Sequence, residues 1–299
     1  MREPSAALAE SGVPNATAAF RRGSRRHVLW SDVLLFGSVA AYLGLVLLAP
    51  LGALAWRVVE LGLADVLRSL MGPAPLEALW RSLVLVAIAL AVNAVFGMLG
   101  AIVLARHRFP GRELIDALVD IPLAVSPVMV GLAYLLVFGR TGWLAPLLEP
   151  LGVRIAFAFP GLVTATVFVT LPFVVREVGY VLEELGTDEE QAARTLGASR
   201  WTTFRRITLP NVAGGFGYGL TLTAARALGE FGAVLVVGGA IIGSTDTATT
   251  FIYAAVEERQ NAAAYGMAAL LAAASMLLLV GLERLNPHGR ENRNGHQGS

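Results

Sequence analysis

Thr187-Asp-Glu-Glu-Gln-Ala-Ala-Arg-Thr-Leu-Gly-Ala-Ser-Arg-Trp-Thr-Thr-Phe-Arg-Arg-Ile-Thr-Leu-Pro210 is the most informative stretch of this chain. Thr187 followed three residues later by Glu190 is the pattern of a capping box at a helix N-terminus. The two acidic residues between them place negative charge near the positive end of that helix. Gly197 predicts a left-handed stop at its C-terminus. The stretch therefore predicts a short helix with both ends defined.

A second helix is expected from about Ser199, and Leu209 and Pro210 are expected to end it at a membrane surface. Ala192 and Ala193 give the first helix a face with small side chains. Such a face can enter a groove of another protein with little loss of side-chain freedom. The alternative is an ordinary amphipathic connector, and local chemistry alone does not choose between the two.

The composition around this stretch is that of a membrane protein. Of 299 residues, 56% are hydrophobic and 15% charged, against about 25% charged in soluble domains. Each of six apolar runs approaches or exceeds the roughly 20 residues that span a bilayer. The expected spans are Val33–Trp56, Ser82–Ala105, Ile121–Phe138, Ala158–Val175, Asn211–Gly238 and Ala262–Leu282.

The positions of the cationic residues predict the orientation of these spans. All 23 are arginines, and 16 of them fall in segments on the side of the N-terminus while six fall on the other side. Because cytoplasmic segments are enriched in Arg and Lys, both termini are expected in the cytoplasm. The domain organisation is then a polar tail, 1–32, a six-span domain, 33–284, and a polar tail, 285–299. Both tails are expected to be cytoplasmic, and the first to be disordered.

The composition also excludes several kinds of chemistry. The chain has no cysteine and no lysine, which excludes thiolate sites, Schiff-base chemistry and the P-loop that needs lysine.

The outer loop, 142–157, has leucines at a spacing that suits either a short helix in the membrane interface or an ordinary packed loop.

The stretch 187–210 resembles the EAA motif of bacterial ABC-importer permeases. In that motif two alanines follow an acidic residue, and a glycine and an Ile-x-Leu-Pro element follow at fixed distances. The matching positions are Ala192, Ala193, Gly197, Ile207, Leu209 and Pro210. Gln191 stands where glutamate is usual, beside Glu190, so the resemblance implies the helix but not an ionic contact from that position. It implies that residues 176–210 form the loop that couples the permease to a partner ATPase.

The resemblance extends from about Leu118 to Leu282. It includes the stretches Asp120-Ile-Pro-Leu-Ala-Val-Ser126-Pro-Val and Ala225-Arg226-Ala-Leu-Gly229-Glu230-Phe231-Gly232. These stretches are similar to oxyanion importers, and in combination to the W-type subunits of the sulfate/thiosulfate family. Molybdate permeases share the Leu-Gly-Glu-Phe-Gly element, so a molybdate or tungstate permease is the alternative. An ATP-independent channel or carrier is a third possibility, which the EAA loop opposes.

The family implies an all-α, type I ABC-importer permease fold in the cell inner membrane, without catalysis by this chain. It implies two copies of a cytoplasmic ABC ATPase, a second, T-type permease and an extracytoplasmic sulfate-binding protein, with lipid around the spans and no nucleic acid. This chain is expected to bind no cofactor, because ATP is used by the partner ATPase. The expected mechanism is alternating access driven by that ATPase.

The expected translocation path contains polar residues of the spans: Ser126, Thr221, Thr223, Arg226 and Glu230. A charge near mid-bilayer is costly and marks a functional candidate, and Glu230 lies four residues after Arg226 on the same helix face. Either this pair contacts the anion or it locks helices together, and the lock is favoured. Gly229 and Gly232 either break the helix beside Glu230 and expose backbone amides to an anion or allow close helix packing, and the packing is favoured.

Two other functions find little support. Gly215-Phe-Gly-Tyr-Gly219 is similar to a potassium-channel filter, but it occurs once. The four histidines, His27, His107, His288 and His296, are scattered outside the expected spans, so no metal site is expected.

Overall fold

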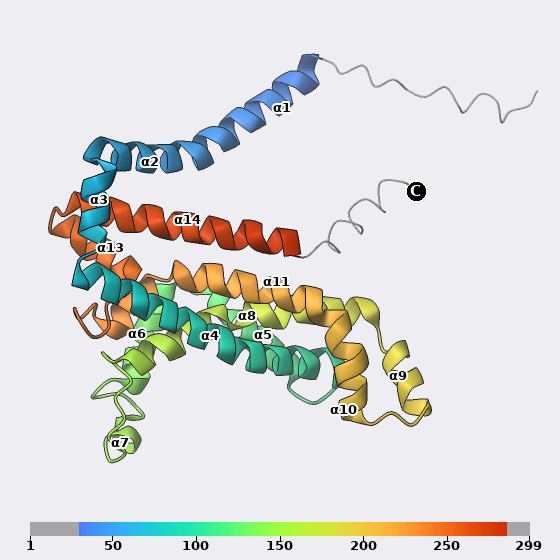
Figure 1. The fold of residues 1–299 in the computed structure, drawn as a ribbon. Coiled ribbons are helices and arrows are strands. Elements are labelled where there is room, and N and C mark those ends of the chain that lie inside the picture. Colours follow the sequence, from blue (N-terminus) through green and yellow to red (C-terminus); the bar gives the residue numbers. More distant parts are fainter. Residues whose placement is uncertain (1–29, 286–299) are drawn as a thin grey trace, which may run out of the picture. The chain divides into compact units, whose positions relative to one another are not determined.

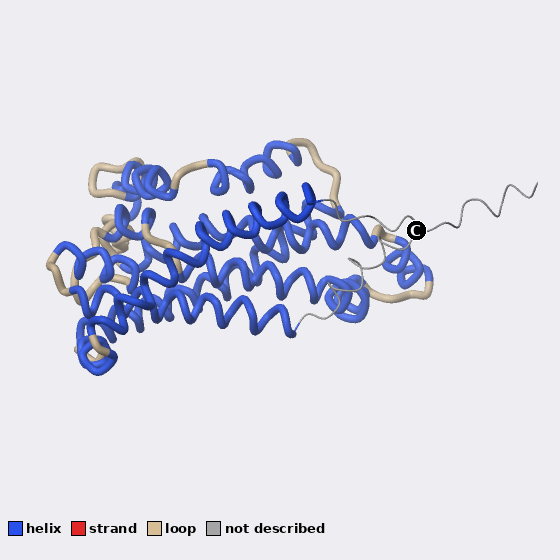
Figure 2. The backbone as a smooth tube through the Cα atoms, turned by 90° about the horizontal axis from the view of Figure 1, so that it is seen from above, coloured by secondary structure: helices blue, strands red, loops and turns tan. Residues whose placement is uncertain are grey.

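The computed structural model describes residues 30–285, and every regular element in that range is a helix (Figures 1 and 2). The predicted polar tails, 1–32 and 285–299, lie almost wholly outside the described residues. The chain divides into two units, residues 1–53 and 54–299. The described part of the first unit contains α1 (Trp30–Leu43), a turn of π-helix, η1 (Gly44–Leu48), and the start of α2 (Ala49–Leu61).

The second unit contains the remaining helices. They are α3 (Leu63–Leu70), α4 (Pro73–Arg106), α5 (Arg112–Ala124), α6 (Pro127–Phe138), α7 (Ala145–Leu148), α8 (Phe159–Leu185), α9 (Asp188–Thr195), α10 (Arg200–Thr203), η2 (Phe204–Thr208), α11 (Leu209–Leu228), α12 (Gly232–Gly238), α13 (Ala248–Glu257) and α14 (Asn261–Leu285). Figure 1 shows α9 and α10 at one end of the bundle and α7 and α13 at the other.

Helix α8 lies at the centre of the bundle and packs against α4, α11, α12, α5 and α6. Towards the α9 end its buried face carries Val174, Val178 and Leu182, which pack against α4 and Val212 of α11. Towards the other end Val169 packs among residues of α6 and α12. The two halves of α8 thus pack against different helices. Its C-terminus lies beside the start of α9 because only residues 186 and 187 connect them.

Four helical segments are long and apolar enough to cross a membrane, namely 33–61, 73–106, 159–185 and 261–281. Two bent pairs bring the number of candidate spans to as many as six. The six predicted spans fall on these segments, but several predicted ends are wrong. Helix α8 runs ten residues beyond Val175, and α4 begins nine residues before Ser82, because helices continue past the apolar run where neighbours cover them.

The third predicted span, 121–138, is not one helix. Helices α5 and α6 meet there at 116°. Val125 and Ser126 are extended, with ψ of 140° and 136°, because the ring of Pro127 disfavours helical backbone in the residue before it. Pro127 then opens α6, where its missing amide costs nothing. The Ser-Pro dipeptide was the sequence signal for this bend.

The fifth predicted span, 211–238, is broken as well, with α11 and α12 inclined at 56°. Gly229 ends α11 and Phe231 precedes α12. A Cβ on Gly232 would lie 3.0 Å from Val128 and 3.2 Å from Pro127. The helix is therefore broken and closely packed at these glycines, and the break of this span lies against the break of the third. Exposure of the backbone amides to an anion stays a prediction.

The filter-like sequence 215–219 is helical, within α11. A Cβ on Gly215 would meet the Glu177 carbonyl oxygen at 2.9 Å, and one on Gly219 would meet backbone atoms of α8 at 3.0 Å. Gly217 has open space. Glycines four residues apart on one face allow close helix contact in a membrane, and this contact replaces the channel interpretation.

The outer loop contains a helix of only one turn, α7. Trp143, Leu147 and Leu151 are 86%, 65% and 69% exposed in this chain. The expectation of a short helix is confirmed in a reduced form, and its placement in a membrane interface stays a prediction.

Candidate functional site

The C-terminus of α9 ends in a Schellman motif. The amide of Gly197 donates to the carbonyl of Arg194 at 3.0 Å, and the amide of Ala198 donates to that of Ala193 at 3.0 Å. Gly197 has a φ of +86°, which only glycine adopts without strain. This is the pattern of hydrogen bonds that defines the motif, and the predicted left-handed stop at Gly197 is confirmed.

The predicted capping box at the N-terminus of α9 is wrong. Thr187 precedes the helix but accepts no capping hydrogen bond from its backbone. Its hydroxyl instead accepts from Nε2 of Gln191 at 2.7 Å. The carboxylate of Glu190 points away from the helix start into the bundle, because it has partners there.

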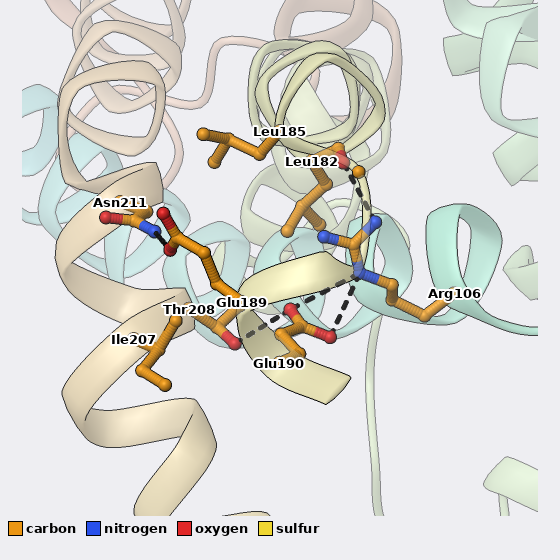
Figure 3. A pocket seen from close by; sticks show the side chains of 9 residues that line it. Arg106, Leu182, Leu185, Glu189, Glu190, Ile207, Thr208 and Asn211 are labelled. Carbon is orange, nitrogen blue, oxygen red and sulfur yellow. Dashed lines mark hydrogen bonds and ion pairs between the residues drawn. The ribbon is translucent and has the colours of Figure 1, made fainter. Parts of the chain in front are cut away.

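Glu190 forms a buried ion pair with Arg106, at the end of α4 (Figure 3). Nε of Arg106 lies 3.3 Å from both carboxylate oxygens, and each side chain is 12% exposed. One nitrogen of the same guanidinium donates to the carbonyl of Leu182 at 2.8 Å. The hydroxyl of Thr208 donates to Glu190 at 2.9 Å. One carboxylate thus connects α9 with α4 and η2.

A second contact lies beside this pair. The amide of Asn211 donates to the carboxylate of Glu189 at 2.7 Å. Both residues line a small pocket between the ends of α4 and α8 and the start of α11 (Figure 3). Arg106, Thr208 and Asn211 could not be assigned to this site from the sequence, since only the fold brings them to α9.

The remaining predicted coupling residues lie in α9 and in the segment that follows it, up to residue 210. Ala192 is exposed and Ala193 is half-buried. Ile207 lines the pocket, and Leu209 packs on the core around α8. Two large apolar side chains of the segment 187–210 are also exposed, namely Leu196, which is 89% exposed, and Trp201, which is 67% exposed.

The second helix begins as predicted, because Ser199 caps it by accepting from the Thr202 amide at 3.1 Å. Pro210 does not end it. The helix continues through η2 into α11, where Pro210 occupies the first turn. The expectation of a stop at Leu209 and Pro210 is therefore wrong, since the π-helical turn η2 just before Pro210 accommodates a proline within a continuing helix.

Arg226 and Glu230 form the second charged cluster. Their nearest nitrogen and oxygen are 2.6 Å apart, and the Glu230 side chain is fully buried while that of Arg226 is 32% exposed. The other carboxylate oxygen of Glu230 accepts from the Ala233 amide at 3.0 Å. The backbone carbonyl of Glu230 accepts from the hydroxyl of Thr249 at 2.7 Å. Glu230 therefore joins the end of α11 to α12 and α13.

The structure does not bring the other predicted path residues to this pair by any contact. Thr221 donates to the carbonyl of Gly217 in its own helix at 2.8 Å, and Thr223 faces the carbonyl of Thr170 at 3.4 Å. Both threonines are buried, which fits structural roles. Ser126 is exposed at the bend between α5 and α6.

Residues 30–285 contain no group of three or more His, Asp and Glu side chains placed to hold a metal ion. His27, His288 and His296 lie outside the described residues.

Comparisons with known proteins place this arrangement in a family. Residues 94–288 match the family of binding-protein-dependent transport system inner membrane components. The sulfate transport system permease protein CysW of Synechococcus elongatus is 44% identical over 246 residues, which cover 82% of this chain and 86% of that protein. The sulfate transport system permease protein CysT of Escherichia coli K12 is 36% identical over 273 residues, covering 91% and 99%.

A solved structure shares the fold. A chain of a bacterial alginate ABC transporter, in complex with a periplasmic protein that binds an alginate pentasaccharide, superposes with a TM-score of 0.72 at 18% identity. The match covers 87% of this chain and 97% of that one. The fold is that of an ABC-transporter permease. This chain is therefore an integral membrane protein that belongs to the family of binding-protein-dependent transport system inner membrane components, as a non-catalytic permease subunit.

Proposed function

We propose that the chain is the W-type permease subunit of an ATP-driven importer for sulfate and thiosulfate in the cell inner membrane. It forms half of the translocation path and couples to a partner ATPase through α9. The coupling role is supported by the structure at the C-terminal end of α9 and in the segment that follows it. The Schellman motif at Gly197 fixes a rigid helix end, and Ala192, Leu196 and Trp201 are exposed around it.

An exposed apolar surface beside a rigid helix end favours a protein partner. Tryptophan is among the residues that carry most of the binding energy in interfaces, and covering the Leu196 side chain would remove apolar surface from water. Ala192 leaves room for the partner surface to approach the helix. The occupant we propose is one copy of an ABC ATPase, with a second copy on the other permease.

The anion is proposed from the relatives, since CysW and CysT are both named for sulfate transport. Their two names also support a T-type permease as the other half of the path. The family's description as binding-protein-dependent supports an extracytoplasmic binding protein as the donor of the anion. In this assembly the chain binds no cofactor, and ATP is used by the partner ATPase. Both termini lie in the cytoplasm, on the side of α9.

The proposed substrate is tested in a bacterium that lacks its own W-type sulfate permease. Expression of this chain with its cognate partners should restore uptake of radiolabelled sulfate. Excess thiosulfate should compete with that uptake, whereas molybdate at the same concentration should not. Competition by molybdate alone would assign the chain to a molybdate importer, and uptake without any ATPase would contradict the ABC mechanism.

A further inference from the structure

Helix α9 is short, and few neighbouring elements pack against its backbone. It packs mainly against α10 and η2, the segments that directly follow it in the chain. A helix attached in this way would tilt when a partner pulls on it. Its orientation relative to α4 and α8 therefore depends on the side chains that reach across from those helices.

Arg106 is placed to supply that connection. It lies in the last turn of α4 and donates to the carbonyl of Leu182, in the last turn of α8. The last four carbonyls of a helix have no partner within the helix and carry partial negative charge. The same guanidinium lies 3.3 Å from both oxygens of Glu190, in the first turn of α9. One side chain thus joins three helices.

The other contacts of Glu190 show that this carboxylate has little freedom. Thr208 donates to the oxygen that also faces Arg106. The adjacent Glu189 is held by Asn211 at the start of α11. Because the ion pair is 12% exposed on each side, water screens it little, and loss of either partner leaves an uncompensated charge.

We propose that Arg106 is a positioning residue that fixes the orientation of α9 and transmits the movement of the docked ATPase to α4 and α8. This inference rests on the proposed function, because it requires that α9 is the docking helix. Arg106 is buried beside Glu190, whereas Ala192, Leu196 and Trp201 are exposed. Its role is to convert displacement of α9 into displacement of the spans.

The test is the number of ATP molecules hydrolysed per sulfate imported by the complete complex in proteoliposomes. Arg106→Lys keeps the cation beside Glu190, so the complex should assemble, but an ammonium does not reproduce the guanidinium fork. The double variant Arg106→Met with Glu190→Met removes both charges, and its yield should approach that of the wild type. In both variants the ratio should rise about threefold to tenfold. Arg108→Met, which removes an exposed arginine two residues further on, is the matched control and should leave the ratio unchanged.

The outcomes separate the inference from the proposed function. A wild-type ratio in both Arg106→Lys and the double variant would show that the pair only stabilises the fold, and would overturn the inference. Rising ratios with normal complex yield would support it. Failure of the wild-type chain to co-purify with an ATPase would contradict the proposed function itself, independently of any variant.

Discussion

At the residue scale, the pair Arg226 and Glu230 joins the two broken parts of one span. Glu230 is fully buried, and its two oxygens face different partners, the guanidinium of Arg226 and the amide of Ala233. Arg226 is one-third exposed in the single chain, so one side of its guanidinium can face a partner subunit or a path. The geometry favours the lock between helices that the sequence suggested, and the exposed part of Arg226 keeps an anion contact testable.

The first prediction concerns this pair. Arg226→Met should lower the yield of assembled complex strongly, because removing one member of a buried pair costs roughly 3 to 5 kcal/mol. Glu230→Leu should also lower it, through loss of the pair and of the bond to Ala233. The double variant should recover most of the yield, short by the lost hydrogen bond from the Ala233 amide, about 1 kcal/mol. The measurements are complex yield and sulfate uptake, with Arg68→Met, from an exposed pair with Asp65, as the control.

Uptake by the double variant separates the two roles of Arg226. A complex that assembles and imports normally supports the lock. One that assembles but does not import indicates that Arg226 contacts the anion. Wild-type yield and uptake in both single variants would contradict both roles.

Residues that act locally were predictable from the sequence, and residues that act across the fold were not. Gly197 was predicted because a left-handed stop depends on its own backbone. Glu190 was assigned to a capping box because Thr187 stands three residues before it. In the structure it forms an ion pair with Arg106, which is 84 positions away in the chain. No periodicity in the sequence reports that proximity, so the true partners emerged only from the structure.

At the element scale, α8 and α11 are held together through glycines on one face of α11. A Cβ on Gly215 or Gly219 would lie within about 3 Å of α8 backbone atoms, whereas one on Gly217 would meet open space. Helix-breaking residues explain the elements that were missed. Pro127 and Gly229 stand inside apolar runs, and hydropathy alone counts such a run as one span.

The second prediction tests this packing. Gly219→Ala should lower the thermal stability of the purified permease, because the added methyl would force the backbones of α8 and α11 apart. Gly217→Ala is the matched control two residues away and should leave stability unchanged or raise it slightly, since alanine favours helix by about 1 kcal/mol. Equal melting temperatures for the two variants would contradict the proposed contact.

The third prediction concerns the end of α9. Gly197→Pro cannot adopt a φ of +86° and removes the amide that donates to Arg194. It should insert normally but lose most coupling of ATP hydrolysis to uptake. Gly197→Asn should retain coupling, because asparagine tolerates left-handed backbone. Normal uptake by the proline variant would show that the segment is only a connector.

At the scale of the whole molecule, the fold follows from composition and span length, but the orientation in the membrane rests on the arginine distribution. The structure places α9 and α7 at opposite ends of the bundle (Figure 1). If α9 is cytoplasmic, α7 lies outside. The absence of cysteine in the sequence makes single introduced cysteines free of background.

The fourth prediction uses this property. Glu149→Cys, next to α7, should react with an impermeant thiol reagent in intact cells or spheroplasts. Asp188→Cys, at the start of α9, should react only after the membrane is opened. Both native side chains are exposed in this chain. The reverse pattern would overturn the predicted orientation and with it the docking of a cytoplasmic ATPase on α9.

The central claim is that this chain transports only as part of an ATP-driven complex. It is tested most directly by sulfate uptake into proteoliposomes that contain either this chain alone or the complete complex with its ATPase, second permease and binding protein. The complete complex should import sulfate only when ATP and binding protein are present, and the chain alone should give no flux. Robust sulfate flux driven by a gradient through the chain alone would contradict the claim and indicate a carrier or channel.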